Sequence, residues 1–320
     1  MARRTRTRTG TRTSAGPRRD VDARGEGAGG AATRLRLVDG GLGRRDEARD
    51  PAPLPGEAPC PCGSGRSWDR CCRPRVKRDI PVIRDWARSW LRLGDRVLRF
   101  AFDLLEDPPE AHAIRDLAGG DPGARVNVLF ENLTWKQVSA WITSWSLFWW
   151  IPGPTDPLRA DCGWGEPTLA DEWFARGRRL SRRERAYLDA ALGSAYSFLE
   201  VERRAPGAVF FRDLLLEKRY LVVDPALARD VQEGWIVHGA VARMPFGDAL
   251  LGAGAFLLRT GDAGAVKAFR RRLLRRNRSL DPAFLRGEWR RLAELYVGCL
   301  AGGWETRARV VRGGRSDAGR

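Results

Sequence analysis

Four of the six cysteines in this 320-residue chain lie within a stretch of thirteen residues. One residue separates Cys60 from Cys62, eight residues follow, and Cys71 and Cys72 are adjacent. Thiolates are soft metal ligands, and four of them around one ion form the usual closed tetrahedral zinc site. The density of cysteines therefore predicts a structural zinc site.

The residues between the two cysteine pairs suit a sharp turn. Gly63 and Gly65 can take positive φ angles, which would bring the second pair back over the first. The alternatives are a disulfide or a chance cluster. A bridge between the adjacent Cys71 and Cys72 would be badly strained, and no signal peptide directs the chain to a disulfide-forming compartment. These arguments favour zinc.

The segment from Pro59 to Cys72 resembles the SEC-C motif, the zinc knuckle that ends the translocase ATPase SecA and recurs in small bacterial proteins. Its cysteines match the pattern C-x-C-x8-C-[HC], and Trp68 stands where the family has an aromatic residue. Asp69 replaces the usual lysine. The resemblance implies a docking module for partners such as a secretion chaperone or the ribosome, without catalysis. It also implies zinc ligation by Cys60, Cys62, Cys71 and Cys72.

The formal net charge is +17, mostly because of arginine. Such a charge favours anionic partners, such as an acidic protein, a ribosome or nucleic acid. Abundant Ala, Gly, Arg and Pro are also typical of a GC-rich genome, which would explain the arginines without any function. No apolar run reaches the roughly 18 residues that span a bilayer, so we expect a cytoplasmic protein without a membrane span.

Composition divides the chain into six segments. Residues 1–55 are rich in Arg, Gly, Thr and Ala and lack a periodic apolar pattern, which predicts a disordered basic tail. The other predicted segments are a knuckle (56–75), a mainly helical region (76–195), a small β-barrel-like region (196–260), a basic helical pair (261–304) and a second disordered tail (305–320).

Apolar residues spaced three and four apart predict the helices before residue 196. Capping boxes begin at Thr134 and Ser181. The helix after Thr134 is apolar nearly all round, which favours burial. The predicted helices cover 80–105, 134–152, 169–176 and 181–195.

Short β-prone runs separated by turn residues follow. They predict a small antiparallel barrel or curled sheet, and hence an α+β fold. The region also resembles, more loosely, the companion region of bacterial SEC-C proteins, through Tyr196–Val201, Arg212–Leu215 and Gly234–Arg243. The predicted strands cover 196–201, 209–214, 219–223, 234–244 and 249–258.

Two basic helices are expected near the end of the chain. Asp281 and Pro282 open the second, and Gly302 stops it. The first carries the densest positive charge of any segment predicted to be ordered. It is either a weak anion-binding face or an ordinary solvated face. Its basic residues are Arg270, Arg271, Arg272, Arg275, Arg276 and Arg278.

The sequence contains no recognisable catalytic motif. His112 and His238 lie in unlike contexts, and Cys162 and Cys299 are interpreted as small buried hydrophobes. A catalytic zinc needs an open coordination position, and four thiolates leave none. We therefore expect a zinc-binding adaptor rather than an enzyme. The alternatives are a nucleic-acid-binding protein, and an enzyme of unknown chemistry with the knuckle as an accessory module.

Overall fold

The structure is a computed structural model that describes residues 54–105, 107–118, 135–152, 165, 167–177, 179–252, 257–258 and 260–300. The predicted tails 1–55 and 305–320 lie outside this part, apart from residues 54 and 55, and so does Cys162. The six-segment division stays a prediction. None of the described helices is both long enough and apolar enough to cross a membrane.

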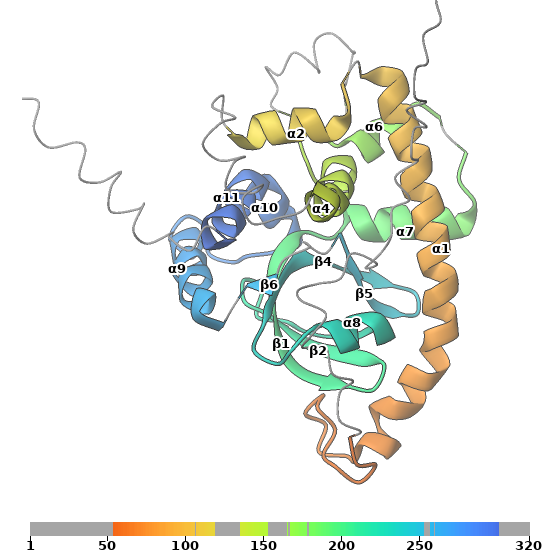
Figure 1. The fold of residues 1–320 in the computed structure, drawn as a ribbon, viewed down its shortest axis with the longest axis vertical. Helices are drawn as coiled ribbons and strands as arrows, with labels where there is room; N and C mark the ends of the chain where they lie inside the picture. The colour runs from red at the N-terminus through yellow and green to blue at the C-terminus, as the bar shows by residue number, and fades with distance from the viewer. Residues whose placement is uncertain are drawn as a thin grey trace, which may run out of the picture. The chain divides into compact units, whose positions relative to one another are not determined.

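The predicted α+β fold is confirmed, because helices surround a small closed barrel of five strands (Figure 1). The barrel follows the order β1-β2-β3-β5-β4 and closes through the pairing of β1 with β4. A two-residue strand, β6, pairs with the start of β4. The strands are β1 (Tyr196–Ala205), β2 (Ala208–Asp213), β3 (Arg219–Val223), β4 (Ile236–Met244), β5 (Gly247–Leu251) and β6 (Leu257–Leu258).

The barrel is mixed rather than purely antiparallel, because β3 and β5 run parallel. The reason is a short helix that the sequence analysis missed, α8 (Pro225–Asp230). The side chain of Asp224 caps α8 by accepting hydrogen bonds from two backbone N–H groups, and Pro225 occupies its first position. This helix reverses the chain after β3, so the β4–β5 hairpin brings β5 back in the direction of β3.

The longest helix, α1 (Cys72–Leu104), begins at the last cysteine of the knuckle, eight residues before the predicted start. Pro81 lies inside it and hides this continuity, since proline usually ends a helix. The predicted helices that follow are also present. The predicted capping box at Ser181 is confirmed, a further one lies at Thr168, and Thr134 lies outside the described residues. These helices are α4 (Trp135–Phe148), α6 (Leu169–Ala175) and α7 (Arg182–Leu192), and α2 (Pro109–Ala118) precedes them.

Of the two predicted C-terminal helices, the first is α9 and the second is divided into α10 and α11. α9 (Ala263–Leu274) carries Arg270, Arg271 and Arg272 of the arginine cluster, whereas Arg275, Arg276 and Arg278 follow its end. α10 (Pro282–Gly287) begins at the predicted proline, and the predicted stop at Gly302 lies outside the described residues. α10 ends at Gly287, and α11 (Trp289–Leu300) continues the chain. The predicted strand at 249–258 is likewise two strands, β5 and β6.

Buried side chains form three clusters. The largest fills the space between the helices and one side of the barrel, and it includes Trp90, Trp145 and Tyr296. The second lies among the barrel strands around Leu199 and Phe211. The third joins the knuckle to β1, β2 and β3. The alternation of side chains along β1 explains why neighbouring residues enter different clusters.

Candidate metal centre

The first cysteine pair lies on a short hairpin. An isolated bridge joins Pro59 to Ser67, and the backbone N–H of Cys60 donates to the carbonyl of Arg66 at 2.7 Å. The backbone N–H of Trp68 donates a hydrogen bond to the carbonyl of Ala58 at 2.8 Å. These bonds fold the chain back on itself, so that the second pair approaches the first.

The two glycines of this hairpin adopt the predicted backbone conformation. Their φ angles are +79° at Gly63 and +74° at Gly65, in the region that side chains disfavour. A Cβ atom at either position would meet no described atom within 4 Å. Backbone conformation, rather than lack of space, therefore accounts for both glycines.

The second pair stands at the start of α1. A short 3-10 helix, Trp68–Arg70, leads into Cys71, and Cys72 is the first residue of α1. The adjacent cysteines thus lie where the chain changes from one helix type to another. This change lets both thiols face the hairpin.

The four sulfur atoms lie within 4.8 Å of one another. The Sγ atoms of Cys62 and Cys71 are 3.5 Å apart, and those of Cys71 and Cys72 are 3.9 Å apart. A tetrahedral ion with metal–sulfur bonds of about 2.3 Å separates its sulfurs by about 3.8 Å. All four are free thiols. The donor set and its spacing therefore fit a metal ion such as zinc.

The four thiols differ in burial, and Cys71 is half-buried. Cys60 and Cys72 are 4% and 8% exposed, whereas Cys62 is exposed. Burial raises the pKa of Cys60 and that of Cys72. Burial also acts upward on Cys62, but hydrogen bonds from the side chain and backbone of Ser64 bring its pKa down to about 6. A bound cation would favour the thiolate at all four positions.

The knuckle packs onto the outer face of the barrel through Trp68. This side chain is 2% exposed, and its ring meets that of Phe210 edge to face with centroids 6.2 Å apart. Val76 from α1 and Leu221 from β3 complete the same cluster. The barrel thus supplies the apolar surface that so short a segment is unable to build for itself.

The basic residues around the knuckle differ in their partners. Arg75 and Arg78 both bind the buried carboxylate of Asp79, at 3.3 and 2.9 Å. The exposed side chains of Arg66 and Arg70 form no ion pair with the described residues. Unpaired positive charge among the described residues of this region therefore lies on the hairpin, on the 3-10 helix and, through the exposed Lys77, on the start of α1.

The predicted anion-binding cluster, on the last turn of α9 and the residues that follow it, contains both paired and unpaired arginines. Arg270 donates to the carbonyl of Leu215 at 2.9 Å and pairs with Glu217, and Arg276 pairs with Glu288 at 3.0 Å. The guanidinium of Arg272 lies over the ring of Phe269. Within the described part of the chain, ion pairs are absent for Arg271, Arg275 and Arg278, which are exposed.

The two histidines occupy separate elements. His112 lies on α2, and His238 lies on β4 with 1% of its surface exposed. The ring of His238 stacks on Tyr296 at 4.4 Å, and neither ring nitrogen has a hydrogen-bond partner among the described residues. Burial lowers the pKa of His238 to about 3. This histidine is therefore a neutral core residue at neutral pH.

The fold and this cluster define an α+β protein with a closed mixed barrel and four cysteines that can hold a metal ion. Comparisons with protein-family models, with curated proteins and with solved structures found no match. The cysteine cluster and the surfaces around it are therefore the features that point to a function.

Proposed function

We propose that Cys60, Cys62, Cys71 and Cys72 hold one Zn²⁺ in a SEC-C-like knuckle, and that the chain is a binding adaptor for an acidic protein or ribosomal partner. The approach of the four sulfurs to within 4.8 Å carries the metal part of this proposal. The match to the C-x-C-x8-C-[HC] pattern carries the family part.

A structural role for the ion follows from its donor set. Four thiolates complete the tetrahedral coordination of zinc and leave no position for water or substrate. Sulfur ligands also select zinc over magnesium or calcium, which prefer oxygen. We therefore propose a binding role rather than a catalytic one.

The docking role is supported by the outward side of the knuckle. Trp68 faces the barrel, whereas Arg66 and Arg70 are exposed without ion pairs among the described residues. An acidic partner surface would complement these charges. The knuckle is thus attached by its apolar side and leaves its basic side open to a partner.

Zinc analysis of the purified protein tests the metal part. We expect about one zinc per chain, as for a single closed site. Cys71→Ser should lose the metal, since a hydroxyl is a poor substitute for a thiolate. Cys299→Ser, which alters a buried thiol outside the cluster, should keep it. Full occupancy in a double variant with Cys60→Ser and Cys71→Ser would refute the site.

Affinity capture followed by nuclease treatment tests the partner class. A protein partner should survive nuclease and be lost when Arg66 and Arg70 are both replaced by glutamine. The matched pair Arg99→Gln and Arg212→Gln removes the same charge from exposed positions elsewhere and should retain the partner. A partner that nuclease releases would instead favour nucleic acid.

Nucleic-acid binding is the second candidate. The observation in its favour is that Arg271 on α9, and Arg275 and Arg278 just after it, are exposed and form no ion pair with the described residues. The observation against it is the use of Arg270 and Arg276 in intramolecular pairs. The adaptor therefore remains the leading proposal.

A further inference from the structure

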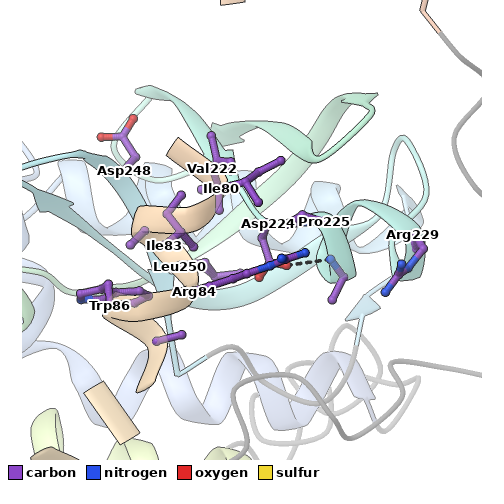
Figure 2. Close-up of a pocket in the computed structure, with 14 residues that line it drawn as sticks. Ile80, Ile83, Arg84, Trp86, Val222, Asp224, Pro225, Arg229, Asp248 and Leu250 are labelled. Atoms are coloured by element: carbon purple, nitrogen blue, oxygen red, sulfur yellow. Dashed lines mark hydrogen bonds between the residues drawn. The ribbon is translucent and has the colours of Figure 1, made fainter. Parts of the chain in front are cut away.

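A cavity of about 270 Å³ opens on the side of the barrel, between α1 and α8 (Figure 2). Its walls come from four elements that are distant in sequence, namely α1, β3, α8 and β5. Neither the knuckle nor the arginine cluster of residues 270–278 contributes a residue to it.

The cavity lies where the pairing between two neighbouring barrel strands, β3 and β5, is weak; we call this place the seam. β3 and β5 are joined at a single residue pair, Val222 with Asp248. The carboxylate of Asp248 accepts a hydrogen bond from the backbone N–H of Leu221 at 3.3 Å. A side-chain oxygen therefore accepts the bond that a backbone carbonyl of a neighbouring strand would normally accept. β3 then gives way to α8, and α1 covers the gap from outside.

The inner wall of the cavity is apolar. Figure 2 shows that Ile80, Ile83 and Trp86 come from α1, while Val222 and Leu250 come from the barrel. Trp86, Val222 and Leu250 are each less than a tenth exposed. A hydrocarbon or aromatic group that entered the cavity would leave water and contact these side chains.

The two acidic residues of the lining already have partners. Arg243 binds the carboxylate of Asp248 at 3.2 Å. The side chain of Asp224 accepts hydrogen bonds from the N–H groups of Ala226 and Leu227, at 2.9 and 3.0 Å. Neither carboxylate therefore needs a cation from a ligand.

The two basic residues of the lining form no ion pair with a described residue, although Arg229 lies near enough to Asp224 to act on its carboxylate electrostatically. Arg84 and Arg229 are exposed, and neither forms an ion pair with any residue that the structure describes. In Figure 2, Arg84 extends from α1 toward the start of α8, and Arg229 stands on α8 beyond Pro225. Unpaired guanidinium groups beside an apolar wall are suited to a carboxylate or phosphate that carries an apolar body.

We propose that this seam cavity, between α1, β3, α8 and β5, binds a small organic anion with an apolar body. Its carboxylate or phosphate group pairs with Arg84 and Arg229, and its hydrocarbon part covers Ile83, Val222 and Leu250. The size of the cavity suits a molecule with an apolar part of modest length. The proposal does not depend on the function of the knuckle.

Calorimetric titration of the full-length chain with simple probes tests this proposal. Octanoate and octyl phosphate each carry both required parts, and they separate the two head groups. Octanol lacks the charge, and acetate lacks the apolar body. We expect saturable binding of at least one eight-carbon anion, with octanol and acetate at least about tenfold weaker. Equal binding of octanol and the anions, or no binding of either anion, would overturn the proposal.

Variants locate the binding. The double variant with Arg84→Gln and Arg229→Gln should weaken the anion by about tenfold. The matched pair Arg99→Gln and Arg212→Gln removes equal charge outside the cavity and should leave the affinity unchanged. Equal losses in the two pairs would show nonspecific attraction and refute the site.

A third variant keeps the proposal testable if the arginine substitutions disturb folding. Ala226→Phe keeps both arginines and places a larger side chain in the cavity. It should abolish anion binding while the melting temperature stays near that of the parent. Unchanged binding in this variant would contradict the assignment.

Discussion

The cysteine knuckle and the β-barrel touch each other, but different forces maintain them. The knuckle draws its four thiols from thirteen consecutive residues and has no apolar core of its own. The barrel joins residues far apart in sequence, such as Tyr196 and Ala240, around buried side chains including Leu199 and Phe211. A local metal site and a non-local core should therefore respond differently to the same perturbation.

Metal removal should separate the two regions most strongly. Structural zinc contributes on the order of 10 kcal/mol in small knuckles, where binding and folding are one process. A chelator should therefore abolish hydrogen-exchange protection in residues 58–75 and leave the amides of β4 protected. Zinc should restore protection on addition. Equal loss in β4 would show one cooperative unit and break the comparison.

Trp68 should couple the regions. Trp68→Ala removes a side chain that is 2% exposed and packs on Phe210, so it should lower the free energy of unfolding by about 3–5 kcal/mol. Phe102→Ala, at a position 53% exposed, should change it by about 0.5 kcal/mol or less. Urea unfolding of the zinc-loaded proteins measures both. Similar effects would place Trp68 outside the shared core.

Acid should weaken each region for its own reason. The knuckle releases zinc as its thiolates take up protons. In the barrel, the pKa of His238 is about 3 in the fold and about 6.5 when unfolded, so the unfolded state gains a proton first as the pH falls. The contribution of neutral His238 to the free energy of unfolding is therefore present above about pH 6.5 and decreases as the pH falls below that value.

His238→Phe should remove the barrel's part of this acid sensitivity. Between about pH 7.5 and pH 5, the variant should gain about 2 kcal/mol of unfolding free energy relative to the parent. The contribution of the knuckle cancels, because both proteins contain it. Urea unfolding at the two pH values provides the test. A constant difference between variant and parent would contradict it.

The smallest effect should come from the exposed arginines on α9 and just after its end. Replacing Arg271, Arg275 and Arg278 with glutamine should change the free energy of unfolding by less than about 0.5 kcal/mol. If the helix is only solvated, the salt dependence of nucleic-acid binding should also stay nearly constant. Each phosphate contact contributes about 0.9 to the slope of log K against log salt. A decrease of about two or more in the magnitude of this slope would favour the nucleic-acid alternative over the adaptor proposal.

Elements that depend on neighbouring residues were predictable from the sequence, whereas those that depend on residues far apart in the chain were not. The capping box at Ser181 and strand β3 agree with the sequence because each depends on neighbouring residues. α1 starts earlier than predicted because Pro81 resembles a helix boundary. α8 was missed because its six residues are too few to show a helical period. Its cap and proline, Asp224 and Pro225, were the available signal.

The sequence by itself determined the cysteine cluster, since its spacing and glycines act over thirteen residues. It also determined most of the longer helices and strands, because these follow local periodicity, but not α8 or the breaks between α10 and α11 and between β5 and β6. Only the tertiary structure decided the parallel pairing of β3 with β5 and the attachment of Trp68 to Phe210. It likewise decided which arginines are paired. Those outcomes depend on which distant segments of the chain come into contact, and a local pattern of residues does not determine such contacts.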